Sequence, residues 1–86
     1  MRRCYLHLRD HVDEILDPEG AEYKSMEDLK ADVLAAARDV MTGDLTRGII
    51  DLRYRIDAED GQGNIVHTLS FEHAVTIITK SPAPTS

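Results

Sequence analysis

A single apolar stripe with helical spacing constrains the fold of this chain more than any other feature. Ser25 precedes the stripe as a candidate N-cap, with Glu27 and Asp28 in the first turn. We expect a helix from this cap to about Met41, ended by Gly43. One amphipathic helix needs an apolar surface to cover, which the flanking segments must supply. The stripe residues, most of them three or four apart, are Met26, Leu29, Val33, Ala36, Ala37 and Val40.

Two other segments alternate apolar and polar residues with the period of a β-strand. The first, residues 3–10, has Cys4, Leu6 and Leu8 on one face. The second, residues 49–58, repeats the alternation and places Arg53 and Arg55 on its polar face. If the two strands share a sheet, we expect an acidic protein to carry a basic, solvent-facing sheet surface. Its residues would be Tyr5, His7, Arg9, Arg53 and Arg55.

Turn residues divide the rest of the chain. Residues 10–11 form a candidate turn into a short strand at 12–16, and residues 17–20 (DPEG) form a second turn. Residues 60–63 (DGQG) indicate a hairpin whose two-residue loop is Gly61-Gln62. That loop predicts pairs of Ala58 with Ile65, Ile56 with His67, Tyr54 with Leu69 and Leu52 with Phe71.

These segments predict an α+β fold in which one helix packs on one face of an antiparallel sheet of three to four strands. The expected order is β-β-α-β-β. Residues 72–79 fit a strand extension, an edge strand or a short helix, and the pattern does not separate these. We expect a single domain over residues 1–79 and a disordered tail over 80–86, which holds two prolines.

Composition limits the classes of function. The formal net charge is −6, and residues 10–32 hold nine acidic residues against two lysines, Lys24 and Lys30. This balance argues against non-specific nucleic-acid binding, which depends on neutralising phosphates. No signal-peptide core and no membrane-length apolar run is found, and the single cysteine, Cys4, is expected to be buried. We therefore expect a cytoplasmic protein with no membrane association.

Five short motifs in a fixed order resemble a family of small bacterial proteins, common in rhizobia and their relatives, that typically open Y-F-F-H-[hydrophobic]-R-D-G. The resemblance covers about residues 3–77. His11 stands where the family usually has Gly, so the first hairpin is expected to be looser. The family has no assigned activity, so the resemblance implies a bacterial cytoplasmic setting and no mechanism. The motifs are residues 5–10 (YLHLRD), 17–20 (DPEG), 36–39 (AARD), 60–63 (DGQG) and 71–75 (FEHAV).

Other chemistry-bearing residues carry no recognisable site. His7 and His11 lie four apart, but on a strand or across a turn that spacing does not place both rings on one metal ion. The acids around Asp17 and Glu19 lack the order of a calcium loop. No nucleophile lies in a catalytic motif, and Gly61-Gln62-Gly63 is not a phosphate loop. We expect no catalytic residues, no metal and no cofactor.

The sequence therefore predicts a small non-enzymatic accessory or protein-interaction domain. It would self-associate through the open sheet face or an edge strand, because a chain of this size gains stability from dimerisation. The alternative is a module that binds an anionic ligand or nucleic acid through the Arg-bearing face. On a further reading, that face is simply solvated, with cross-strand pairs between arginine and aspartate.

Overall fold

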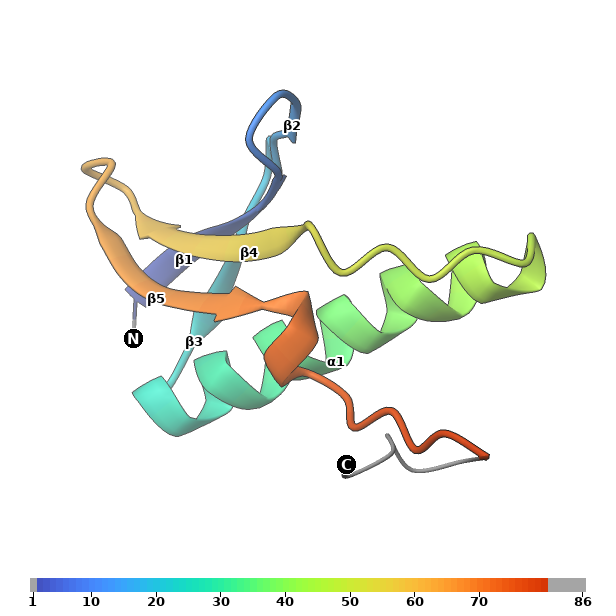
Figure 1. Cartoon of the computed structure of the whole chain (residues 1–86). Helices are drawn as coiled ribbons and strands as arrows, with labels where there is room; N and C mark the ends of the chain where they lie inside the picture. Colours follow the sequence, from blue (N-terminus) through green and yellow to red (C-terminus); the bar gives the residue numbers. More distant parts are fainter. Residues whose placement is uncertain (1, 81–86) are drawn as a thin grey trace, which may run out of the picture.

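The computed structural model describes residues 2–80, in which one helix packs across an antiparallel sheet (Figure 1). The α+β class is therefore confirmed. The sheet has five strands rather than three to four, because residues 21–23 form a further strand before the helix. The elements are β1 (Arg2–Arg9), β2 (Glu14–Ile15), β3 (Ala21–Tyr23), α1 (Met26–Thr46), β4 (Arg55–Asp60), β5 (Ile65–Ser70) and a 3₁₀ turn (Phe71–His73).

The sheet has the order β2-β1-β4-β5, with β3 also paired to β1. β2 pairs with the end of β1, where Leu8 lies opposite Ile15, and β3 pairs with its start, where Cys4 lies opposite Ala21. β2 and β3 thus form one interrupted edge, and β5 forms the other. The first hairpin is confirmed, although β2 is shorter than the expected strand at 12–16.

The helix begins as expected, because the Ser25 hydroxyl accepts a hydrogen bond from the Asp28 N–H at 3.1 Å. The expected stop at Gly43 is wrong, since α1 continues to Thr46. Gly43 therefore lies inside the helix, with helical residues on both sides, and does not end it. The chain leaves the helix at Gly48, whose positive φ of 79° lets its N–H reach the Leu45 carbonyl.

The core lies between one face of α1 and the sheet. Cys4 is 1% exposed, as expected from its place on the apolar face of β1. Phe71, in the 3₁₀ turn, is fully buried and closes the core beside the Tyr54 ring, with 5.9 Å between ring centroids. The other buried hydrophobic residues are Leu29, Val33, Ala37, Met41, Ile56, Ala58 and Ala74.

The expected strand at 49–58 is wrong over its first six residues, because β4 begins at Arg55. Arg55 lies opposite Arg9, the last residue of β1, so no strand is available to pair with residues 49–54. The helix causes this arrangement: at ~1.5 Å per residue it is longer than the strands, and the chain must return along its overhanging end. Residues 48–54 make that return alongside α1 (Figure 1).

The second hairpin forms with a different register. The Asp60 N–H donates to the Asn64 carbonyl, and Gly63 takes a positive φ of 83°, so the loop spans three residues instead of two. Ala58 therefore lies opposite His67 rather than Ile65, and Ile56 lies opposite Leu69 rather than His67, with an irregularity between Ala58 and Glu59. The shift is two residues over most of the strand, so the apolar residues stay on the helix side.

The end of the chain resolves one open alternative. Residues 71–73 form the 3₁₀ turn. Of the three alternatives for residues 72–79, the short helix agrees best with this element. No regular strand follows it up to residue 80. Of the tail expected at 80–86, residues 81–86 lie outside the described residues.

Candidate functional site: the polar face and the edges of the sheet

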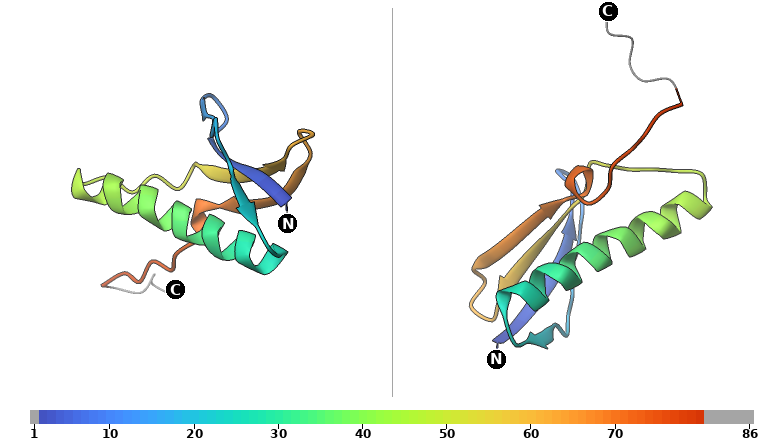
Figure 2. Two further views of the ribbon diagram at one scale, coloured as in Figure 1. Left: turned by 180° about the vertical axis from the view of Figure 1, so that it is seen from behind. Right: turned by 90° about the horizontal axis from the view of Figure 1, so that it is seen from below.

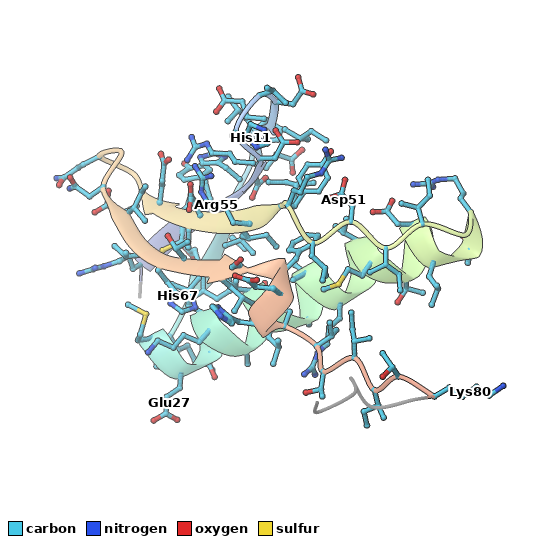
Figure 3. The ribbon with its side chains drawn as sticks, in the orientation of Figure 1. His11, Glu27, Asp51, Arg55, His67 and Lys80 are labelled. Carbon is cyan, nitrogen blue, oxygen red and sulfur yellow. The ribbon has the colours of Figure 1, made fainter. Side chains whose placement is uncertain are left out.

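The face of the sheet opposite α1 carries polar side chains from β1 and β4. Tyr5 lies opposite Glu59, and Arg9 lies opposite Arg55. Four of the five candidate residues are thus on one face, namely Tyr5, His7, Arg9 and Arg55. Figure 3 shows Arg55 on the side of the sheet away from the helix, toward His11.

Arg53 is not part of this face. It lies in the return segment, where its guanidinium pairs with the Asp51 carboxylate at 2.9 Å and its backbone N–H donates to the same side chain. The pairing raises the pKa of Arg53 and lowers that of Asp51 to about 2. The prediction for Arg53 was wrong because the alternation of apolar and polar residues begins before the strand itself, which starts at Arg55.

Arg9 is held by three carboxylates. Its Nη1 lies 2.8 Å from Glu59 and 3.0 Å from Asp57, and its Nε lies 2.9 Å from Glu14. Hydrogen bonds to Glu59, Glu14 and Asp57 raise the pKa of Arg9, and the bond to Glu59 has the largest effect. The guanidinium is therefore already saturated with acidic partners from β2 and β4.

Asp57 is the most buried charged group, with 1% of the residue exposed. Its carboxylate accepts hydrogen bonds from Arg9, from the Arg55 Nε at 3.1 Å and from the Thr68 hydroxyl at 2.9 Å. Burial alone would raise the pKa of Asp57, but the bonds from Arg9 and Thr68 and the charge of Arg55 hold it below its ordinary value. Asp57 is thus an ionised group that ties three strands together.

His7 connects this cluster to the turn at residues 17–20. The Asp17 N–H donates to the His7 Nδ1 at 3.1 Å, while His7 Nε2 lies 3.6 Å from Glu59. Burial alone would raise the pKa of Asp17, but its carboxylate accepts bonds from the N–H groups of Gly20, Leu6 and Glu19, which lower it. His7 and Asp17 therefore act as fixed structural groups.

The expected basic surface is neutralised by carboxylates. Arg9 and Arg55 face Glu14, Asp57 and Glu59, so both guanidinium groups have acidic partners. A depression of about 420 Å³ lies over Arg9, Arg55, Asp57 and the first hairpin. The alternative reading of this face, with cross-strand pairs between arginine and aspartate, agrees with the pair of Arg9 and Asp57, whereas Glu59 was not predicted as a partner, although it alternates with Arg55 in the same run.

The two edges of the sheet differ. Between β2 and β3 the edge is interrupted: Asp17 uses its side chain to bond the Leu6 N–H, and Pro18 follows it. β5 pairs only with β4, and no described segment lies along its outer side (Figure 2). Its six residues, IVHTLS, include no Asp, Glu, Lys or Arg. β5 is therefore an open, uncharged edge, which natural sheets usually protect.

Neither a metal cluster nor a membrane-spanning helix is found in the part of the chain that the structure describes. Residues 2–80 contain no group of three or more His, Cys, Asp or Glu side chains placed to hold a metal ion. Within the same residues, no helix has the length and hydropathy needed to cross a membrane.

Fold and site together define a small α+β domain with a self-neutralised polar face and one open sheet edge. Comparison with protein families places it more closely. The chain belongs to the family described as a domain of unknown function (DUF6894), whose model matches residues 3–72. The match runs from β1 to the 3₁₀ turn. No match was found among curated proteins or among solved structures.

Proposed function

We propose that this protein is a small non-enzymatic interaction domain that binds by adding a strand to the open edge of β5. The observation that carries the proposal is the contrast between the two edges. Asp17 and Pro18 interrupt one edge, whereas β5 offers six consecutive residues without a formal charge. Strand addition uses backbone hydrogen bonds for affinity, so it needs such an edge and no deep cleft.

The direction of the backbone groups supports this use of β5. The Phe71 N–H donates to the Tyr54 carbonyl at 3.0 Å and so points toward β4. Because backbone groups of successive strand residues point to opposite sides, those of Thr68 and Ser70 point to the open side. An added strand would satisfy these N–H and C=O groups.

A second copy of the chain is the occupant that β5 fits best. An antiparallel pair about a two-fold axis at Thr68 would place Thr68 opposite Thr68 of the second copy, and Val66 opposite Ser70. Paired threonines are favourable across strands. Burial and the nearby Lys30 charge lower the pKa of His67, so its ring is neutral at pH 7 and no like charges meet in this pairing.

The alternative, binding of an anionic ligand or nucleic acid through Tyr5, His7, Arg9, Arg53 and Arg55, has weaker support. Arg9 and Arg55 are engaged by carboxylates, and Arg53 lies apart on the return segment. An anion would have to displace Asp57 or Glu59 from the guanidinium groups and would meet their charges. Salt-dependent retention on heparin that is lost in the double variant Arg9→Gln and Arg55→Gln would favour this alternative instead.

Setting and origin belong to the same proposal. We propose a bacterial protein that acts in the cytoplasm, as the resemblance of residues 5–10 to the Y-F-F-H-[hydrophobic]-R-D-G opening implies. A single buried cysteine, Cys4, fits a reducing compartment. Localisation of a tagged chain in its native host would test the setting.

The experiment is sedimentation equilibrium over a concentration series at low and high salt, with two variants of Ser70. This residue has a φ of −77°, so Ser70→Pro fits the backbone while it removes an outward N–H. Ser70→Ala keeps the N–H and is the matched control. We expect a salt-resistant dimer that Ser70→Pro weakens at least about tenfold and Ser70→Ala leaves unchanged.

One outcome would contradict the second copy as the occupant of β5, and another would contradict strand addition at β5 itself. A wild-type chain that stays monomeric at about millimolar concentration would exclude the second copy as occupant, and an extended segment of another protein would then be the remaining partner for β5. A dimer that is equally stable in Ser70→Pro would place the contact elsewhere on the molecule.

A further inference from the structure

A second cavity lies on the helix side of the sheet, away from the polar face. It has a volume of about 360 Å³ and is lined by β1, β3, β5 and the start of α1. Cys4 and Leu29, both almost fully buried, line its apolar part together with Val66, and Met26 lies at its side, 43% exposed. This volume is within the range of ~300–1,000 Å³ that is usual for small-molecule sites.

The charged residues that line this cavity are both cations, and Tyr23 and Ser25 are its neutral polar residues. Arg2 and Lys24 contribute to it, and neither has a carboxylate within ion-pair distance among the described residues. Arg9, Arg53 and Arg55, in contrast, each have an acidic partner. The two free cations therefore lie beside an apolar floor.

No acidic residue is part of the cavity lining, although the hydroxyl of the lining residue Tyr23 donates a hydrogen bond to the Asp32 carboxylate at 2.5 Å. Glu27, in the first turn of α1, points away from the sheet (Figure 3). The charge of Arg2 lowers the pKa of Asp60, but this is the smallest of the effects on that pKa. Asp60 is not among the residues that line the cavity. The positive end of the α1 dipole, at Ser25, lies in the same lining and favours negative charge.

We propose that this cavity binds a small amphipathic anion, namely a carboxylate carried by a short apolar chain. The chain would pack on Cys4, Leu29 and Val66, and the carboxylate would lie between Arg2 and Lys24. No acid of the lining has to be displaced, in contrast to the polar face. β5 contributes the Val66 side chain to the lining, whereas Thr68 and Ser70, whose backbone groups point to the open side, are not part of it, so the inference does not depend on strand addition.

The test is a titration of the ¹⁵N-labelled chain with octanoate, followed through amide shifts of the cavity residues. Octanol, without the charge, and acetate, without the chain, are the matched ligands. We expect octanoate to bind more tightly than both, with the largest shifts at Cys4, Met26 and Leu29. The Ser70→Pro variant should bind octanoate as the wild type does.

Charge variants separate the cavity from the general surface. Arg2→Gln with Lys24→Gln should weaken octanoate binding about three- to tenfold, since exposed ion pairs contribute only modestly to affinity. Arg53→Gln with Lys80→Gln makes the same change in net charge at remote positions and should leave the affinity unchanged. Shifts scattered over the surface, or equal loss in both double variants, would overturn the inference, as would equal binding of octanol.

Discussion

The backbone N–H of Asp17 donates to Nδ1 of His7 at 3.1 Å, and this bond joins the interrupted sheet edge to the polar face. Because Nδ1 is the acceptor, a neutral His7 ring carries its proton on Nε2, toward Glu59 at 3.6 Å. The same residue that interrupts the edge strand is thus positioned by the centre of β1. This link holds the turn that interrupts the edge between β2 and β3.

Replacing His7 should loosen that link. His7→Ala leaves the Asp17 N–H without its acceptor in a part-buried position, which costs about 1–3 kcal/mol of the free energy of unfolding. Chemical denaturation measures the loss, and amide exchange of Asp17 should become faster than that of the helix. His73→Ala is the control, because the His73 side chain is 73% exposed and should change stability by less than ~0.5 kcal/mol. An unchanged Asp17 exchange rate in His7→Ala would contradict this account.

The ionised state of Asp57 predicts a pH dependence of stability. Its pKa is lower in the folded chain than the ~3.9 of an unfolded one. The folded state therefore gains stability from Asp57 above about pH 4 and loses it as the pH falls through the lowered folded pKa. Unfolding experiments between pH 7 and 2 should show this loss. Asp57→Asn should be less stable at pH 7, and its free energy of unfolding should depend less on pH in the acidic range. An Asp57 carboxyl signal that titrates above pH 4 would refute it.

The sequence correctly predicted those elements that are specified by residues close together in the chain. Ser25 and the stripe beginning at Met26 specify the start of α1, and the alternation around Cys4 specifies which face of β1 is buried. The same alternation placed Tyr5, His7 and Arg9 together on the outer face. A period of two decides the face of a strand wherever the strand exists.

The errors depend on contacts between distant segments. Nothing near Arg53 in the sequence shows that β1 ends at Arg9 and leaves residues 49–54 without a partner. The saturation of Arg9 depends on the register that sets Glu59 and Asp57 beside it, and a register is a property of two strands. A basic face was therefore predicted from one strand at a time, whereas in the sheet Arg9 is neutralised by carboxylates of β2 and β4 and Arg55 by Asp57 of its own strand.

Gly43 provides a test of the helix that continues past it. It lies inside α1, and a Cβ at this position would meet nothing within 4 Å. Gly43→Ala should therefore raise the free energy of unfolding by about 0.5–1 kcal/mol, because alanine loses less backbone entropy in a helix. Thermal denaturation measures the gain. A destabilised Gly43→Ala chain would mean that α1 ends at Gly43, as the sequence pattern alone suggests.

Gly20 combines two constraints that can be separated. Its φ is 67°, and a Cβ here would lie 2.7 Å from the Cys4 carbonyl oxygen and 2.8 Å from the Tyr5 ring. Gly20→Ala should thus lose the ~1–2 kcal/mol of a left-handed alanine and more for displacing the β1 backbone. Gly48→Ala is the matched control, since Gly48 has a φ of 79° and a Cβ there would have no neighbour within 4 Å.

The difference between the two alanine variants isolates the contact with β1. In urea denaturation, Gly20→Ala should be less stable than Gly48→Ala by about 1–3 kcal/mol, the usual cost of overpacking. Its amides at Cys4 and Leu6 should also shift, because β3 and the Asp17 turn are held against β1 at this point. Equal losses in the two variants would mean that only the positive φ matters, and that the 17–20 turn does not press on β1.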